Sequence, residues 1–77
     1  MAQVKFQKGQ EEWLMFMDYW NLCQKYWNVE KEDKYWETFI KEVDMFYNKY
    51  RHIELSKHIA LAFINTQEQK YRELINN

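Results

Sequence analysis

Apolar positions recur with the period of an α-helix along most of the chain. From Gln10 to Trp27, at 100° per residue, they cover an arc of about 220°, whereas an ordinary surface helix carries an apolar stripe about 100° wide. The arc contains Leu22, Met15, Tyr26, Tyr19, Cys23, Phe16, Trp27, Trp20, Trp13 and Met17. The pattern predicts a helix over about residues 10–27 that either lies at the centre of a bundle or turns a second apolar face outward.

Two further helices are predicted downstream, over about residues 31–51 and 56–75. Their apolar side chains cover arcs of about 140° and about 160°. Ser56 has a side chain suited to the N-cap of the third helix. Gln67 falls in the middle of the third apolar arc, which predicts a buried or interfacial amide that needs hydrogen-bond partners.

The junction between these two helices contains no glycine or proline. If the second helix simply continued, the third apolar arc would be centred about 110° away from the second. A break near His52–Leu55 would let both stripes face one interior. The rival is a single helix of about 45 residues, about 67 Å long, which would be stable only when paired with another chain.

The first eight residues differ from the rest of the chain. Val4 and Phe6 alternate with Lys5, which suits a short strand or an arm on a partner, and chain ends are commonly mobile. We therefore expect residues 1–8 to form a flexible arm and residues 9–77 a single helical domain. The predicted fold class is all-α, a small three-helix bundle with a short extended or disordered N-terminal arm.

The supply of apolar side chains exceeds what such a bundle can bury. The 77 residues are 47% hydrophobic and 19% aromatic. A chain of this length buries only about 60% of the surface that its unfolded form exposes. Cys23 is the only cysteine, so no internal disulfide reinforces the fold. The surplus must lie at the rim of the core or face a partner.

Charge narrows the range of partners. The chain has 11 basic and 12 acidic residues and a net charge of −1, without the basic excess of a sequence-independent nucleic-acid binder. Its apolar runs are too short for a transmembrane helix, and its first residues lack the apolar stretch of a signal peptide. We expect a cytoplasmic protein with no membrane contact.

The side chains that usually carry chemistry show no catalytic or metal-binding pattern. His52 and His58 are six residues apart, whereas metal pairs on a helix are three or four apart. Cys23 lies within the first apolar arc and is predicted to be a small buried hydrophobe. The carboxylates lie on polar helix faces. The sequence thus predicts no enzyme, no cofactor, no metal and no small-molecule substrate.

The surplus of aromatic side chains instead suggests a protein-binding face, because Trp and Tyr are typical interface anchors. We expect this face among apolar residues outside the densest part of each arc. The candidates are Leu14, Met15, Tyr19, Leu22, Tyr26, Met45, Leu55 and Leu61. The partner would be a second copy of the chain or a host protein.

Three other interpretations stay open at this point. The chain can be a monomer with an incompletely covered surface, or an obligate homodimer whose extra apolar surface is covered by its own copy. It can also be a helix-turn-helix regulator that binds nucleic acid. In that case Lys57, His58, Lys70 and Arg72 would contact phosphates.

The chain is rich in Lys, Asn, Ile and Tyr, and it contains characteristic stretches such as Glu11–Trp20 and Gln67–Glu73. In these respects it resembles small helical proteins of phages and other mobile elements of low-GC Gram-positive bacteria. The similarity extends over the whole chain and includes no motif, so no functional residue is carried over. The resemblance implies a compact accessory protein that binds and occludes a host defence or regulatory protein.

Overall fold

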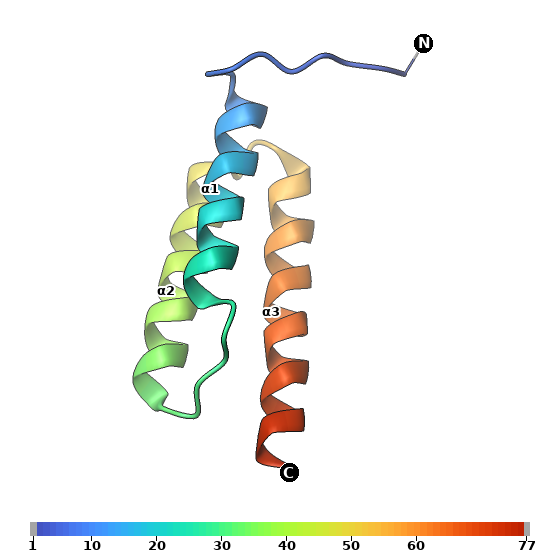
Figure 1. Cartoon of the computed structure of the whole chain (residues 1–77). Helices are drawn as coiled ribbons and strands as arrows, with labels where there is room; N and C mark the ends of the chain where they lie inside the picture. The colour runs from blue at the N-terminus through green and yellow to red at the C-terminus, as the bar shows by residue number, and fades with distance from the viewer. Residues whose placement is uncertain (1, 77) are drawn as a thin grey trace.

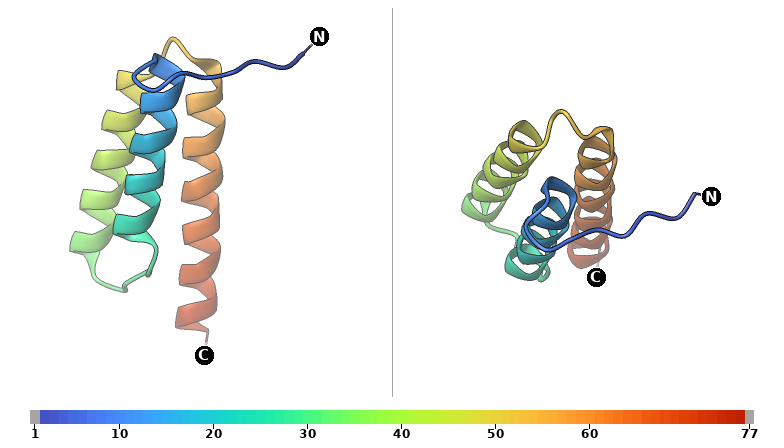
Figure 2. Two further views of the ribbon diagram at one scale, coloured as in Figure 1. Left: turned by 45° about the horizontal axis from the view of Figure 1, so that its top comes forward. Right: turned by 90° about the horizontal axis from the view of Figure 1, so that it is seen from above.

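The computed structural model describes residues 2–76, and three α-helices make up most of that range. They are α1 (Glu11–Tyr26), α2 (Asp33–Lys49) and α3 (Glu54–Ile75), and consecutive helices run in opposite directions (Figure 1). Seen along the bundle, the helices occupy the corners of a triangle (Figure 2). The predicted all-α three-helix bundle is confirmed.

The break between the second and third helices is also confirmed. Residues 50–53 form a turn in which the Ile53 amide donates to the Tyr50 carbonyl at 2.9 Å. The chain reverses there, so α2 and α3 lie side by side instead of forming one long helix (Figure 1). The reversal brings their two apolar stripes, which a continuous helix would hold apart, onto one interior.

Ser56 does not cap α3, so that prediction is wrong. The helix begins at Glu54, and its N-cap Ile53 provides no side-chain hydrogen bond. Ser56 lies inside the first turn, fully buried, and its hydroxyl donates to the Tyr50 carbonyl at 2.8 Å. Its side chain therefore fastens the start of α3 to the end of α2, and the tight turn, rather than a cap, decides where the helix starts.

Phe39 of α2 is the centre of the core and is completely buried. Its ring centroid lies 5.3 Å from that of Tyr26 in α1, 5.8 Å from Tyr35 and 5.4 Å from Phe63 in α3. The contact with Phe63 is edge-to-face, an arrangement that aromatic pairs favour. One aromatic cluster thus joins all three helices.

Gln67 closes the end of the core where α1 ends. Its side chain is completely buried, which is one of the two placements predicted for it. Its amide nitrogen donates to the carbonyls of Tyr26 at 2.7 Å and Trp27 at 3.1 Å. The Tyr35 hydroxyl donates to the same Tyr26 carbonyl at 2.7 Å. The last carbonyls of a helix have no partner within the helix, and here α2 and α3 provide the donors.

Residues 2–8 contain no helix or strand and run across the end of the bundle (Figure 1). A turn follows, in which the Gln10 amide donates to the Gln7 carbonyl at 3.1 Å. Gly9, the third residue of this turn, has φ of 93°, a conformation that side chains with a Cβ rarely adopt. Gly9 thus separates residues 2–8 from α1. A flexible arm over residues 1–8 stays a prediction, and Met1 lies outside the described residues.

The bundle leaves more large apolar side chains outside than inside. Within residues 2–76, ten apolar side chains are buried and fourteen large ones are exposed. Scattered exposed apolar residues are ordinary in proteins, whereas a contiguous group usually has a purpose. The arrangement of the exposed ones therefore decides where a functional surface can lie.

Candidate functional site

The structure corrects most of the predicted binding face on α1. Met15 is completely buried, and Leu22 and Tyr26 are 8% and 6% exposed. Tyr19 is half-buried, and its ring packs against Phe46 of α2, with 5.9 Å between the ring centroids. The prediction that Met15, Leu22 and Tyr26 face a partner is wrong, because α2 and α3 both pack on this side of α1. The Tyr19 ring lies on the same side and is partly covered by the core.

The other four predicted residues, Leu14, Met45, Leu55 and Leu61, are exposed but do not form one surface. Met45 lines a groove between α1 and α2, whereas Leu61 lines a second groove between α2 and α3. Leu14 belongs to α1 and Leu55 to the first turn of α3. They are separate exposed side chains rather than the parts of one site.

The contiguous apolar surface lies on the opposite side of α1. We name it the outer α1 face and define it by Trp13, Phe16, Met17, Trp20 and Trp27. Their exposed fractions are 36%, 39%, 45%, 61% and 55%, respectively. These positions lie within about 100° of one another on the helix, and no charged residue falls among them. Trp27 follows the last residue of α1 but keeps helical dihedral angles.

The N-terminal arm adds to the outer α1 face at one end. The Phe6 ring packs on Phe16 with 6.0 Å between centroids. Together with Trp13, Met17 and Trp20 these rings line a shallow, open hollow whose walls are almost entirely apolar. Phe6 remains 44% exposed, so the arm extends the apolar surface and does not cover it.

Lys70 of α3 positions the other end of the outer α1 face. Its ammonium nitrogen lies 3.5 Å from the centre of the Trp27 ring and donates to the Trp27 carbonyl at 3.2 Å. A cation this close to the face of an indole ring attracts it electrostatically. The contact holds Trp27 against α3 while leaving more than half of its side chain exposed.

The sequence groups the tryptophans of the outer α1 face on one side of the helix, whereas only the tertiary contacts show that this side faces outward. Trp13, Trp20 and Trp27 are spaced seven residues apart, the repeat that keeps side chains on one side of a helix. Asp18 and Lys25 flank the inner residues instead, and both bind α2. Charged residues with distant partners therefore mark the side of α1 that faces the bundle.

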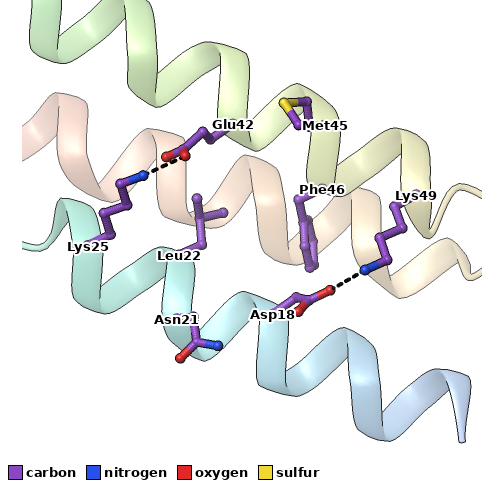
Figure 3. Close-up of a pocket in the computed structure, with 8 residues that line it drawn as sticks. All are labelled: Asp18, Asn21, Leu22, Lys25, Glu42, Met45, Phe46 and Lys49. Atoms are coloured by element: carbon purple, nitrogen blue, oxygen red, sulfur yellow. Dashed lines mark hydrogen bonds and ion pairs between the residues drawn. The ribbon is translucent and has the colours of Figure 1, made fainter.

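These ion pairs frame the groove between α1 and α2 (Figure 3). Lys49 donates to Asp18 at 3.0 Å, and Lys25 donates to Glu42 at 2.6 Å. Leu22 lies between the two pairs and contributes to the apolar lining. The groove is thus bridged at two places by side chains that bind each other, and it forms part of the seam between the helices.

The carboxylates of the groove are held in their charged form. Burial alone would raise the pKa of Asp18, but hydrogen bonds from Tyr50 and Lys49 outweigh it and lower the pKa below its ordinary value. Burial also acts on Glu42, where the hydrogen bond and the charge of Lys25 likewise lower the pKa. Such carboxylates carry no proton near neutral pH, which suits a role in joining helices.

The Cys23 thiol and the imidazoles of His52 and His58 each contact different residues. Cys23 is half-buried beside Tyr19, and burial raises the pKa of its thiol, which disfavours the reactive thiolate. His52 binds Glu11 at 2.9 Å, and His58 lies 3.9 Å from Glu54. Each imidazole thus has a carboxylate neighbour of its own. Within residues 2–76 no group of three or more potential ligands is arranged to hold a metal ion.

No helix in the part of the chain that the structure describes has both the length and the apolar character needed to cross a lipid bilayer. Comparisons of the chain with protein-family models, with curated proteins and with solved structures found no match.

Proposed function

We propose that this chain is a non-enzymatic interaction module that docks on a protein surface through the outer α1 face. The observation that carries the proposal is the charge-free stripe of five large, exposed apolar side chains on one helix. Three of the five are tryptophans, and tryptophan is enriched among the interface side chains that dominate binding energy.

The size of the surface supports the same proposal. If a fully exposed large side chain presents about 200 Å², the outer α1 face and Phe6 together expose roughly 600 Å² of apolar surface. A specific interface buries about 800 Å² on each partner, with an apolar centre and a polar rim. The outer α1 face can supply the centre, and the polar residues beside it can supply the rim.

A nucleic-acid ligand is less well supported by the charges. Of the four residues that would contact phosphates, Lys70 binds Trp27, Arg72 lies 3.8 Å from Glu68, and His58 lies 3.9 Å from Glu54. The outer α1 face itself carries no cation to meet a phosphate. The helices α2 and α3 also lie side by side (Figure 1), whereas the two helices of a helix-turn-helix cross steeply.

Two methionine variants test the proposal. Met17, on the outer α1 face, and Met45, on α2, are 45% and 61% exposed. Met17→Glu would place a charge inside the docking surface, whereas Met45→Glu adds the same charge elsewhere. Circular dichroism should show that both variants fold like the wild type, because neither side chain is in the core.

Each protein is then immobilised and exposed to a lysate of the cells that produce it. We expect a protein that the wild type and Met45→Glu retain equally and that Met17→Glu loses by tenfold or more. If Met17→Glu retains the same proteins as the wild type, docking through the outer α1 face is refuted.

A further inference from the structure

We infer that the occupant of the outer α1 face is the same face of a second copy, with the two α1 helices antiparallel. The inference rests on the proposed function, since it names the partner of that surface. A two-fold interface requires a surface that is complementary to itself. Three properties of α1 meet that requirement: the order of its side-chain sizes, the charges at its two ends and the area that it exposes.

The first property is the distribution of bulk along the outer α1 face. Trp13, Phe16 and Met17 crowd the N-terminal half, whereas Cys23 and Gln24 leave the C-terminal half thinner before Trp27. In a parallel pair the crowded halves would meet each other and the thin halves would leave a void. An antiparallel pair places the crowded half of one helix against the thin half of the other, which fills space more evenly.

The second property is the opposite charge at the two ends. Glu12 precedes Trp13 and Lys70 lies on Trp27, and within residues 2–76 neither has an ion-pair partner of opposite charge. Around the helix, Glu12 projects to the same side as Tyr19, which packs on Phe63 of α3. An antiparallel pair keeps both α3 helices on one flank and therefore brings Glu12 of one copy beside Lys70 of the other. A parallel pair puts the two Glu12 residues on opposite flanks and at the end of the helix pair away from both Lys70 side chains.

The third property is the area available. The roughly 600 Å² of apolar surface on each copy, with its polar surroundings, approaches the 800 Å² per partner of an ordinary specific interface. Both copies would cover their exposed tryptophans in the same contact. A single foreign helix could also cover the face, and the experiment below separates the two occupants.

Sedimentation velocity of the full chain from about 1 µM to about 100 µM measures self-association, because mass action drives dimerisation. We expect dimers for the wild type and for Met45→Glu. We expect the dimer dissociation constant of Met17→Glu to rise by tenfold or more, since two charges would be buried without partners. A wild type that stays monomeric at the highest concentration overturns the inference, as does a dimer that Met17→Glu leaves unchanged.

Zero-length cross-linking with a carbodiimide tests the antiparallel order. The reagent joins a carboxylate to an amine in direct contact, and peptide mapping should find Glu12 joined to Lys70. Within one chain these residues lie near opposite ends of α1, about 20 Å apart by helix rise, so that link can form only between copies. Glu12→Lys should weaken the dimer, and the swap Glu12→Lys with Lys70→Glu should restore it. A dimer with neither the link nor the rescue refutes the antiparallel order.

These outcomes are distinct from a failure of the proposed function. If the wild type is monomeric but retains a foreign protein that Met17→Glu does not retain, docking through the outer α1 face stands and the second copy is excluded. If the wild type is monomeric and no retained protein depends on Met17, both the proposed function and this inference fail.

Discussion

Helices α1 and α2 have similar lengths but use their apolar residues in different ways. Helix α2 buries Tyr35, Phe39, Val43 and Phe46 along one side and is the most clearly amphipathic of the three helices. Helix α1 buries only three side chains, and the five residues of the outer α1 face lie on another side of it. One apolar side of a helix is enough to build this bundle. The second apolar side of α1 therefore needs another explanation, and the docking that we propose offers one.

The contrast between buried and exposed apolar residues predicts which substitutions lower the free energy of unfolding. The largest loss should come from the centre of the core. Phe39→Ala removes a completely buried ring that touches all three helices. We expect it to lower the free energy of unfolding by about 3–5 kcal/mol, which for a domain of this size approaches the whole stability.

The control for this variant is Trp20→Ala, which removes a larger side chain that is 61% exposed. We expect Trp20→Ala to change the free energy of unfolding by less than about 0.5 kcal/mol. Urea unfolding followed by circular dichroism measures both, at about 1 µM so that association does not add to stability. Equal losses would mean that the monomer covers both sides of α1.

The two sides of α1 can be compared directly with one pair of residues. Met15 is completely buried, and Met17, two positions later, is 45% exposed. The same change to alanine affects helix propensity equally in both. We expect Met15→Ala to lower the free energy of unfolding by about 2–4 kcal/mol and Met17→Ala by less than about 0.5 kcal/mol. The same urea titration measures the two values, and a reversed order would show that the inner and outer sides are assigned wrongly.

The end of α1 should show a smaller effect through Gln67. Gln67→Ala removes one of two side-chain donors from each of two carbonyls. The Tyr26 carbonyl keeps the Tyr35 hydroxyl, and the Trp27 carbonyl keeps the Lys70 ammonium group. We expect a loss of about 1–3 kcal/mol in the free energy of unfolding. Gln69→Ala is the matched control, because Gln69 is exposed and its amide reaches only Glu73 at 3.4 Å. A Gln67→Ala variant as stable as Gln69→Ala would refute the capping role of the buried amide.

The smallest effect should come from pH, through the inner side of α1. Burial raises the pKa of Tyr19 to about 12, above its ordinary value of 10.0. The phenol therefore contributes stability that is present below pH 10.0 and is lost as the pH rises toward 12. Unfolding by urea at increasing alkaline pH should show a shallower loss of stability for Tyr19→Phe than for the wild type. Identical pH dependence in both proteins would contradict this contribution.

The phage or mobile-element origin stays a prediction. It rests on a similarity of composition without a motif, and no functional residue is carried over from it. Docking on another protein needs only the exposed surface, so the proposed function does not depend on that origin.

The local pattern of hydrophobic and polar residues was sufficient to predict the three helices and the surplus of apolar side chains. The periodicity places three helices within a few residues of their bounds, and the shift in phase after α2 reveals the break. Gln67 in the middle of an apolar arc indicated a buried or interfacial amide, and the structure buries it. These features depend on neighbours along the chain, which a helical projection describes.

Only the tertiary structure decided which side of α1 faces inward. Both sides are rich in large apolar residues, so hydrophobicity alone does not separate Met15 from Met17. Contacts far apart in the sequence do so, because Asp18 and Lys25 meet Lys49 and Glu42 only after α2 has folded back. The turn at Ser56 likewise depends on Tyr50, across the junction of two helices. Such pairings come from packing, and a one-dimensional pattern does not contain them.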